Sequence, residues 1–525
     1  MSQINRALIS VSDKTGLLPL CHFLKDQKVE IVSTGGTAKM LKENGIPIVG
    51  ISDFTGFPEM LDGRVKTLHP KVHGGLLGLR DNEEHQKTMQ EHGILPIDLV
   101  IVNLYPFEEV SKKADSSFEE IIENIDIGGP SMLRSAAKNF KFVAVVTHPN
   151  QYERVMDAMK SGDGTLSYAM RKELAQEAFT LTNRYDALIA AFLKKGKQEI
   201  SDFPERFEFR GEKMQDLRYG ENPHQKAACY KLEENTTEPA LVTAKKLQGK
   251  ELSFNNILDF DAAISCVKEF QEPACVIVKH TNPCGVAVSD TGLQAFERAW
   301  AADSLSAFGS LIAFNREVDG ETAKAITAHF VEGVIAPAFS EEALKIFQAK
   351  KNIRLMAEPH LLGWIQKANP KTNDRFDIKK IVGGFLLQER DLNIENETHF
   401  EVVTEKSPTS KQMQDLCFAW KVVKHVKSNA IVYVKDRTTV GIGAGQMSRV
   451  DSAKMGVLKA VTSLQDAVLG SDAFFPFRDG VDTAAVSGIQ AIVQPGGSLR
   501  DPEVIHACNE HSIAMVFTKT RHFRH

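Results

Sequence analysis

The sequence predicts an α/β protein with more than one domain, and three observations carry this prediction. Short, β-rich apolar runs alternate with amphipathic helical stretches, a pattern typical of parallel sheets covered by helices. The chain has 525 residues, several times the length of an ordinary domain of roughly 150 residues. A polar stretch at residues 196–202 interrupts the periodicity and marks the main boundary.

The first domain is expected to be a doubly wound parallel sheet. Its predicted elements, in order, are a strand at 7–12, a helix at 17–25, a strand at 29–33, a helix at 36–43, a strand at 46–51 and two central strands at 98–104 and 142–146. In such a domain, ligands bind at the carboxyl ends of the strands.

The remainder of the chain continues the alternation. An amphipathic pattern at 166–195 predicts one or two helices. Strands are then expected at 275–278, 310–314, 333–336, 430–434 and 491–493. About 325 residues exceed one ordinary core, so we expect two subdomains, divided near 365–380. No short-period repeat is visible.

The composition indicates a protein that binds small ligands. Hydrophobic residues make up 42% and charged residues 25%, and 63 basic residues against 68 acidic ones leave a net charge of −5. This balance provides no cationic field for a nucleic-acid backbone. No uncharged apolar run approaches the length of a membrane span, and the N-terminus lacks a signal pattern, so we expect a cytoplasmic protein.

The cysteines argue against a disulfide framework or a zinc site. Seven cysteines are scattered and never form C-x-x-C. Cys284 follows a proline as in zinc deaminases. However, the only H-x-E string, His399 to Glu401, comes after it and has no P-C-x-x-C downstream. Catalytic zinc is therefore not expected.

Hydroxyl-rich turns follow two neighbouring strands of the first domain, at residues 10–16 and 33–37. The pair Gly35-Gly36 begins a helix, where backbone N–H groups can approach an anion. One such turn alone would be explained by a tight strand–helix connection. Two at adjacent strand ends favour a phosphate pocket.

Three further segments of the first domain carry reactive groups. Residues 62–75 combine three cations and two histidines with proline and glycine, which indicates a loop for an anionic substrate or a solvated basic loop. Tyr105 ends a strand and should face the ligand. Asp126 precedes Gly128-Gly129 and, taken alone, reads as a helix cap; Lys138 lies on the helix that follows.

In the second domain, Lys279 and His280 emerge from a buried strand into an N-P-C-G turn. A histidine that titrates near neutrality beside an ammonium group suits general-base catalysis, although a surface turn is the plain alternative. Residues 471–479 place three phenylalanines among charges, which fits either the floor of a heterocycle pocket or core packing.

Five strings along the chain together resemble a known family. They are GRVKTLHP at 63–70, DIGG at 126–129, RYGENPHQ at 218–225, VKH at 278–280 and FFPFRD at 474–479. Over essentially the whole chain, and in this order, the sequence resembles the bifunctional purine biosynthesis proteins, in which phosphoribosylaminoimidazolecarboxamide formyltransferase is fused to IMP cyclohydrolase.

This resemblance implies a division of labour between two domains. Residues 1–198 would form a methylglyoxal-synthase-like domain that closes 5-formamidoimidazole-4-carboxamide ribonucleotide (FAICAR) to IMP. Residues 199–525 would form two cytidine-deaminase-like subdomains without zinc. They would transfer formyl from 10-formyltetrahydrofolate, a cosubstrate, to 5-aminoimidazole-4-carboxamide ribonucleotide (AICAR). The family is a homodimer whose transformylase sites cross the subunit interface; it needs no tightly bound organic cofactor, and potassium binding is left open.

The resemblance also implies roles for residues of the cyclohydrolase. Lys66 would stand near the reacting carbonyl, with Tyr105, Asp126 and Lys138 around the closing ring. The residues implied to bind the nucleotide there are Ser12, Lys14, Ser33, Thr34, Gly35, Gly36, Thr37, Arg64, Thr67, Gly128 and Gly129.

For the transformylase, the resemblance makes His280 the group that removes the amine proton and Lys279 the group that stabilises the oxyanion. The residues implied to bind nucleotide or folate are Arg218, Tyr219, Glu332, Asn429, Arg449, Phe474, Asp479 and Arg521. Some family members carry aspartate where this chain has Glu332, so the contact made by that residue is left open.

Two other interpretations remain. The chain could be a deaminase-like hydrolase, and analysis for bound zinc would separate a zinc-dependent form of it from a transferase. Its first domain could instead be a regulatory nucleotide-binding module. The presence of Lys66, Tyr105, Asp126 and Lys138 argues against such a module.

Overall fold

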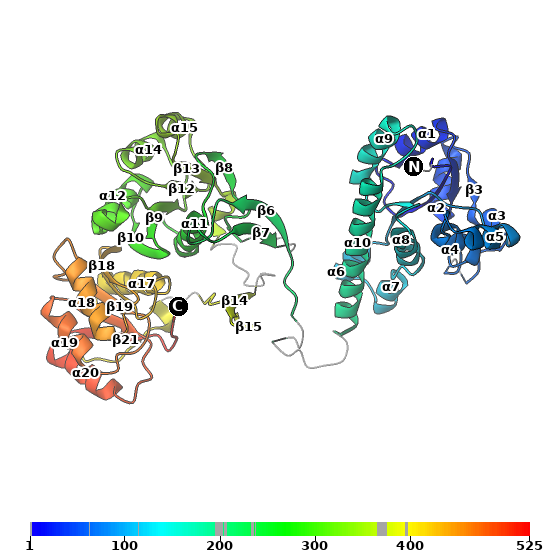
Figure 1. Ribbon diagram of the computed structural model, residues 1–525. Coiled ribbons are helices and arrows are strands. Elements are labelled where there is room, and N and C mark those ends of the chain that lie inside the picture. Colours follow the sequence, from blue (N-terminus) through cyan, green and yellow to red (C-terminus); the bar gives the residue numbers. More distant parts are fainter. Residues whose placement is uncertain are drawn as a thin grey trace. The chain divides into compact units, whose positions relative to one another are not determined.

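The computed structural model places the polypeptide in two separate units, Met1–Pro204 and Glu205–His525 (Figure 1). It describes residues 3–61, 64–113, 115–194, 203, 207–232, 236, 238–364, 375–393 and 397–525. The expected domain boundary at 198/199 lies outside the described residues, as does much of the expected subdomain boundary near 365–380.

Unit 1 is built on five parallel strands in the order β3-β2-β1-β4-β5. The strands are β1 (Arg6–Val11), β2 (Glu30–Ser33), β3 (Val49–Gly50), β4 (Leu99–Asn103) and β5 (Ala144–Val146). The strand order reverses at β1, which has β2 on one side and β4 on the other. The carboxyl ends of these three strands therefore meet at a topological switch point, where ligands of open α/β sheets bind.

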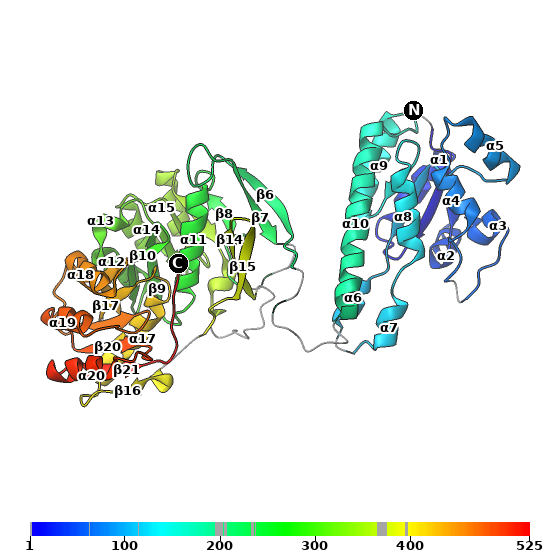
Figure 2. The ribbon, with the colours of Figure 1, turned by 60° about the horizontal axis from the view of Figure 1, so that its bottom comes forward.

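The helices of unit 1 enclose this sheet. They are α1 (Leu17–Asp26), α2 (Gly35–Glu43), α3 (Ile51–Thr55), α4 (Pro70–Leu77), α5 (Glu83–Glu91), α6 (Phe107–Lys112), α7 (Phe118–Glu123), α8 (Gly128–Lys138), α9 (Tyr152–Ser161) and α10 (Tyr168–Lys194). Helix α8 packs on β4 and β5 and contacts α4 and α10, while α1 contacts β2 and α9. Figures 1 and 2 both show α8 beside α10.

Most predicted elements of unit 1 are present, with one clear difference. The strand expected at 46–51 is reduced to Val49–Gly50. Pro47 has no N–H to donate to a neighbouring strand, and Ile51 already begins α3. The pattern at 166–195, which allowed one or two helices, forms the single helix α10.

Unit 2 contains a mixed sheet of twelve strands. Its central strands are β9 (Ala274–Lys279), β10 (Asn282–Val288), β11 (Leu311–Phe314), β12 (Gly333–Ala336), β13 (Arg354–Ala357), β17 (Ile431–Lys435), β18 (Thr438–Gly443), β19 (Val468–Ser471), β20 (Ala491–Gln494) and β21 (Ala514–Phe517), with β8 (Lys245–Gln248) and β16 (Glu401–Val402) at its edges. Two hairpins stand apart, β6 (Gly211–Leu217) with β7 (Ala227–Leu232) and β14 (Phe376–Ile381) with β15 (Gly384–Glu389).

The twelve-stranded sheet consists of two halves with the same strand order. The first half runs β10-β9-β11-β12-β13, and the second runs β18-β17-β19-β20-β21. In each half the first three strands are antiparallel and the last three are parallel. The halves join edge to edge where β10 pairs with β18, at Ala287 and Thr438. Figure 1 shows them in green and in yellow to red.

The helices of unit 2 divide its core in three. They are α11 (Phe254–Val267), α12 (Gly292–Ala302), α13 (Ser304–Ala307), α14 (Gly320–Thr327), α15 (Glu341–Phe347), α17 (Ser410–Val423), α18 (Arg449–Lys459), α19 (Asp479–Val486) and α20 (Asp501–Glu510). Helices α11 and α17 bury their apolar residues in one core shared by both halves. On the other face, each half has a core of its own.

Candidate active sites

In unit 1, the carboxyl ends of β1 and β4 are tied together by one amide side chain. Asn103 Oδ1 accepts hydrogen bonds from Ser12 N at 2.6 Å, Ser12 Oγ at 2.9 Å and Asp13 N at 3.0 Å. Asn103 Nδ2 donates to the carbonyl of Asp13 at 3.1 Å. The turn after β1 is therefore held against the end of β4. Sequence reasoning missed Asn103 because an amide at a strand end carries no motif.

Two lysines approach the N-terminus of α2. A Cβ placed on Gly35 would lie 3.5 Å from Lys66 Nζ, and one on Gly36 would lie 3.8 Å from Lys14 Nζ. Gly35 also has φ +46, a conformation that favours glycine. The two ammonium groups add to the positive end of the helix and to its open N–H groups. The arrangement suits an anion such as a phosphate.

The hydroxyl groups around this helix divide into two sets. Ser33 Oγ donates to the carbonyl of Ile9 at 2.9 Å, and Thr37 Oγ1 bonds both backbone groups of Val11. Both side chains are buried; the Ser33 bond ties the end of β2 to β1, and the Thr37 bonds hold α2 to β1. Thr34 Oγ1 instead pairs with Ser10 Oγ at 2.8 Å, between the ends of β1 and β2.

Asp126 lies at the N-terminus of α8, next to the glycine pair. Its Oδ1 accepts the N–H of Gly129 at 2.8 Å, which caps the helix. A Cβ on Gly129 would lie 2.3 Å from Asp126 Oδ2, and one on Gly128 would lie 2.6 Å from Thr67 Oγ1. The glycine pair is thus required for the close approach of Asp126 and Thr67.

The ionisable groups of this region influence one another. Burial raises the pKa of Asp126, against the opposing effects of hydrogen bonds from Gly129 and Tyr105 and of the charge on Lys66. Burial also raises the pKa of Tyr105, and the charge on Asp126 adds to the effect. The Tyr105 side chain is nevertheless 44% exposed. Lys66, Tyr105 and Asp126 therefore form one electrostatic group.

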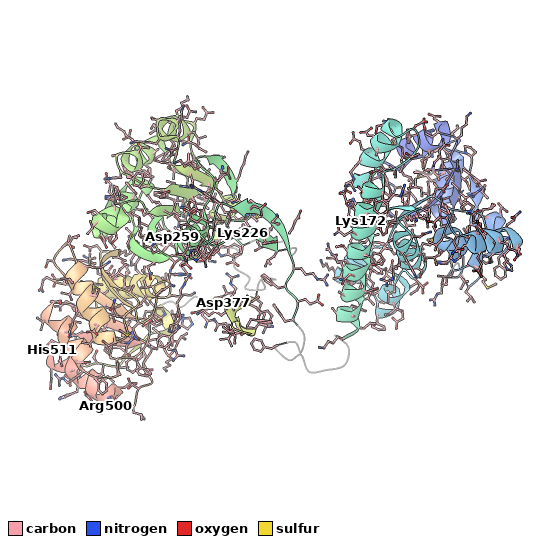
Figure 3. All side chains as sticks on the ribbon, viewed as in Figure 1. Lys172, Lys226, Asp259, Asp377, Arg500 and His511 are labelled. Carbon is pink, nitrogen blue, oxygen red and sulfur yellow. The ribbon has the colours of Figure 1, made fainter. Side chains whose placement is uncertain are left out.

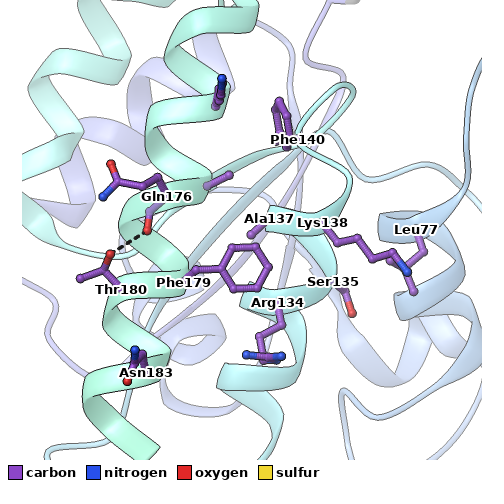
Figure 4. A pocket seen from close by; sticks show the side chains of 12 residues that line it. Leu77, Arg134, Ser135, Ala137, Lys138, Phe140, Gln176, Phe179, Thr180 and Asn183 are labelled. Atoms are coloured by element: carbon purple, nitrogen blue, oxygen red, sulfur yellow. Dashed lines mark hydrogen bonds between the residues drawn. The ribbon is translucent and has the colours of Figure 1, made fainter. Parts of the chain in front are cut away.

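Arg64 and Lys138 each have surroundings of their own. Arg64 is exposed and paired with Glu123. Lys138 is the last residue of α8, about 15 Å along the helix from Gly128. It lines a groove of about 870 Å³ between α8 and α10, together with Arg134 and Phe179 (Figure 4). Within one chain, the structure does not bring Lys138 to Asp126.

In unit 2, Lys279 and His280 form the end of β9 and the turn to β10. Lys279 Nζ donates to the carbonyls of Phe308 and Gly309, each at 2.9 Å. One of its three N–H groups is left for a ligand. His280 is exposed and has φ +54, and Thr281 follows with φ +62. Successive positive φ values are those of a two-residue type I′ hairpin.

A cavity of about 290 Å³ adjoins this turn at the junction of the two halves. Lys279 and His280 line it from one half, and Gly441, Ala444 and Gln446 line it from the other. Cys284 also lines it, but burial raises the pKa of its thiol to about 12, so it stays protonated at neutral pH.

Asn429 and Arg449 lie in a network just before β17 and at the start of α18, in the second half. Asn429 Oδ1 accepts Arg449 Nη2 at 2.8 Å, and its amide nitrogen donates to the carbonyl of Gln446 at 3.0 Å. Arg449 is buried and also donates to Ser471 Oγ and to Asp472. Arg449 thus positions Asn429. Asp472, fully buried and absent from the sequence prediction, holds Arg449.

The remaining predicted residues of unit 2 occupy separate surroundings. Glu332 forms an ion pair with Arg354 at 2.6 Å, beside the start of β12. The guanidinium of Arg218 lies 5.7 Å from the ring of Tyr219, and that of Arg521 lies 4.3 Å from the ring of Phe523. Phe474 is half-buried after β19, whereas Phe475 is core. Asp479 is exposed at the start of α19.

The described residues contain neither a metal-binding cluster nor a membrane-spanning helix. No group of three or more His, Cys, Asp or Glu side chains in this part of the chain is placed to hold a metal ion. None of the described helices is long and apolar enough to span a membrane.

Comparisons with known proteins agree along the whole chain. The family model of the AICARFT/IMPCHase bienzyme matches residues 136–459, and the MGS-like domain matches residues 16–131. The bifunctional purine biosynthesis protein PurH of Magnetococcus marinus is 54% identical over 538 aligned residues, which cover 100% of both chains. The crystal structure of ForH is 36% identical and covers 36% of this chain and 98% of its own, with a TM-score of 0.33. The match at 16–131 confirms the fold predicted for the first domain.

Proposed function

Because the chain belongs to the AICARFT/IMPCHase bienzyme family, we propose that each of its two units carries one of that family's two reactions. The family predicted from sequence is thereby confirmed. The chain is a bifunctional enzyme of purine biosynthesis: it transfers a formyl group to AICAR, giving FAICAR, and closes FAICAR to IMP. The full-length match does not favour a deaminase-like hydrolase with a regulatory module.

We assign ring closure to unit 1. The observation that carries this assignment is the pair Lys14 and Lys66 at the N-terminus of α2, next to the Tyr105–Asp126 group. The substrate phosphate would bind at the helix, which puts the imidazole near Tyr105 and Asp126. Ser12, Thr34 and Thr67 are proposed to contact the nucleotide there, and Ser33 and Thr37 to support the site by their bonds to β1.

In ring closure, the carboxamide nitrogen attacks the formyl carbon, and the formyl oxygen leaves as water. Both reacting groups belong to one molecule, so holding them together supplies much of the acceleration. Lys66 would stabilise the negative charge that develops on the formyl oxygen. Asp126, whose pKa is raised by burial, and Tyr105 would move the proton from nitrogen to the departing oxygen. Lys138 remains a separate candidate, to be tested by its own substitution.

We assign formyl transfer to the turn of Lys279 and His280 and its cavity. The amine of AICAR attacks the formyl carbon of 10-formyltetrahydrofolate, and the N10 nitrogen leaves. His280 would take the proton released by the amine, and the remaining N–H of Lys279 would donate to the oxyanion. Arg218, Tyr219, Glu332, Asn429, Phe474, Asp479 and Arg521 are proposed to contact nucleotide or folate, with Arg449 acting through Asn429.

Four further features belong to the same proposal. Neither reaction uses zinc, because the folate delivers the formyl group and ring closure is an internal dehydration. No organic group need stay bound between turnovers. A homodimer is expected, and analytical ultracentrifugation of the full chain tests it. A cytoplasmic location is expected and is tested by cell fractionation.

The experiment that tests the proposed function uses the full chain with AICAR and 10-formyltetrahydrofolate. Tetrahydrofolate and IMP should form in equal amounts. Tetrahydrofolate without IMP would remove ring closure from the proposal. If neither product formed, both reactions would be removed from the proposal.

A further inference from the structure

The two halves of unit 2 share a residue-by-residue register as well as a strand order. Residues 253–288 align without a gap with residues 409–444, and nine of the 36 positions are identical. In this register α11 matches α17, and both have fourteen residues. Gly285 matches Gly441, where a Cβ would meet a helix carbonyl at 2.0 and 2.3 Å respectively. Unit 2 therefore contains an internal duplication that can be followed residue by residue.

Both halves contain the same hairpin turn, held by the same aspartate. His280 and Thr281 have φ +54 and +62, and their matches Asp436 and Arg437 both have φ +53. The sixth residue of α11 is Asp259 and the sixth of α17 is Asp415; Figure 3 labels Asp259.

Each aspartate accepts the backbone N–H of the second residue of its turn, and Asp415 also accepts that of the first. Asp259 Oδ1 accepts the N–H of Thr281 at 2.6 Å. Asp415 Oδ1 accepts the N–H of Arg437 at 2.6 Å, and its Oδ2 accepts that of Asp436 at 3.0 Å. Burial raises the pKa of both carboxyl groups, and hydrogen bonds from the two turn amides oppose the effect in each. The bond from helix to turn is thus a feature of the duplicated fold.

The lysine before each turn is duplicated as well. Lys279 Nζ donates to the carbonyl of Phe308 at 2.9 Å, and Lys435 Nζ donates to the carbonyl of Gln465 at 2.8 Å. A lysine and an aspartate hold the turn from two sides in both halves. What differs between the halves is the residue that the turn presents, a histidine in one and an aspartate in the other.

The surroundings of the two turns also differ. Asp436 is paired with Lys411, and its carbonyl accepts a hydrogen bond from Arg298, the seventh residue of α12. The seventh residue of α18 is Met455, which lines the cavity next to His280. The second turn is therefore bonded to an arginine through its backbone, and its aspartate is paired with a lysine, whereas the first turn adjoins the cavity. His280 lines that cavity, and its match Asp436 does not.

We propose that Asp259 is a positioning residue for formyl transfer: its carboxylate holds the His280–Thr281 backbone so that the imidazole of His280 faces the cavity. This proposal rests on the proposed function of His280. Asp259 acts through the turn and does not touch the reacting atoms. Asp415 accepts from its own turn in the same way, and that turn has no catalytic side chain. It is therefore the matched control.

The test compares Asp259→Ala with Asp415→Ala in the full chain. Both substitutions remove the carboxylate that accepts hydrogen bonds from the turn, so both should lower the unfolding midpoint of unit 2 by a similar amount. Formyl-transfer kcat should fall about tenfold or more in Asp259→Ala, because a small displacement of a reacting group is costly. It should stay within about twofold of wild type in Asp415→Ala. Asp259→Asn keeps an acceptor oxygen and should restore most of kcat.

A double substitution separates positioning from general damage. If Asp259 acts through His280, Asp259→Ala should cause no further loss in a His280→Ala background. An additional loss there, or an equal fall of kcat in Asp259→Ala and Asp415→Ala, would overturn the proposal. Failure of the proposed function would look different, because His280→Ala alone would then retain formyl transfer.

Discussion

Asn103 and Ser12 stand at the ends of neighbouring strands, and Asn103 Oδ1 accepts both the backbone N–H and the hydroxyl of Ser12. The bond fixes the turn after β1. This turn carries Lys14, whose ammonium group approaches the N-terminus of α2. Ser12 Oγ also donates to the carbonyl of Leu104, so the residues leading to Tyr105 depend on the same contact. One amide thus connects the proposed phosphate site to the proposed site of ring closure.

Asn103→Ala should therefore impair ring closure although Asn103 belongs to no sequence motif. The substitution removes the acceptor of three hydrogen bonds and frees the turn that carries Ser12 and Lys14. We expect the kcat/KM of FAICAR cyclisation to fall about tenfold or more. Formyl transfer by the same preparation is the internal control. Unchanged cyclisation would show that the turn keeps its position without Asn103.

Lys66→Met tests the charge at the reacting oxygen. The substitution keeps most of the stem and removes the ammonium. Loss of one oxyanion donor typically costs about 10²-fold or more in kcat, and we expect that fall in steady-state cyclisation of FAICAR, with formyl transfer retained. A raised KM with kcat preserved would mean that Lys66 only binds phosphate.

The sequence contains enough to predict the strands of both units and the turns that follow them. Buried parallel strands read as continuous apolar runs, and glycine, hydroxyl and histidine residues at their ends are local signals. Contacts that join distant segments are not local. Asn103 bonds across 91 positions to Ser12, and Asp472 holds Arg449 from another strand end. These residues were missed for that reason.

Two other features can be recognised from the sequence alone. Lys138 is ten positions after Gly128 on the same helix, so the helical rise alone separates it by about 15 Å from the helix start, beside Asp126. The duplication in unit 2 is visible when residues 253–288 are compared with 409–444, but only a quarter of the positions are identical. The identities lie at positions such as Asp259 and Gly285 that hold the turn and the helix contact.

The two units should be catalytically separable. Residues 1–198 include the whole sheet of unit 1 and all of the proposed ring-closure residues. Expressed alone, this fragment should convert FAICAR to IMP without folate, measured by the absorbance change on ring closure. A soluble, folded fragment without this activity would contradict separability.

Unit 2 should lose stability on acidification because of its buried ion pairs. Burial raises the pKa of Glu238, but Arg390 and Lys268 outweigh it and lower the pKa to about 2. Burial also raises the pKa of Glu269, but His425 and Lys424 outweigh it and lower the pKa to about 2. Burial lowers the pKa of His425 to about 4.

Folding shifts the pKa of all three groups in the same direction. Each has a lower pKa in the folded state, so the unfolded state binds more protons in acid. The free energy of unfolding should fall from pH 6.5 to 4 because of His425 and from pH 4.5 to 2 because of the glutamates, by on the order of 2 kcal/mol per group.

All three tryptophans of the chain lie in unit 2, so denaturation followed by tryptophan fluorescence reports this unit. His425→Gln should reduce the fall in the free energy of unfolding between pH 6.5 and 4, whatever it does to stability at neutral pH. A wild-type stability independent of pH between 6.5 and 4 would contradict the effect assigned to His425.

The most direct test of two separate sites is the pair of activities of His280→Ala in the full chain. With AICAR and 10-formyltetrahydrofolate, tetrahydrofolate release should fall by about 10²-fold or more, because a positioned proton acceptor is lost. With FAICAR supplied, IMP should form at the wild-type rate, because unit 1 is unchanged. Equal loss of both activities would contradict the assignment of one reaction to each unit.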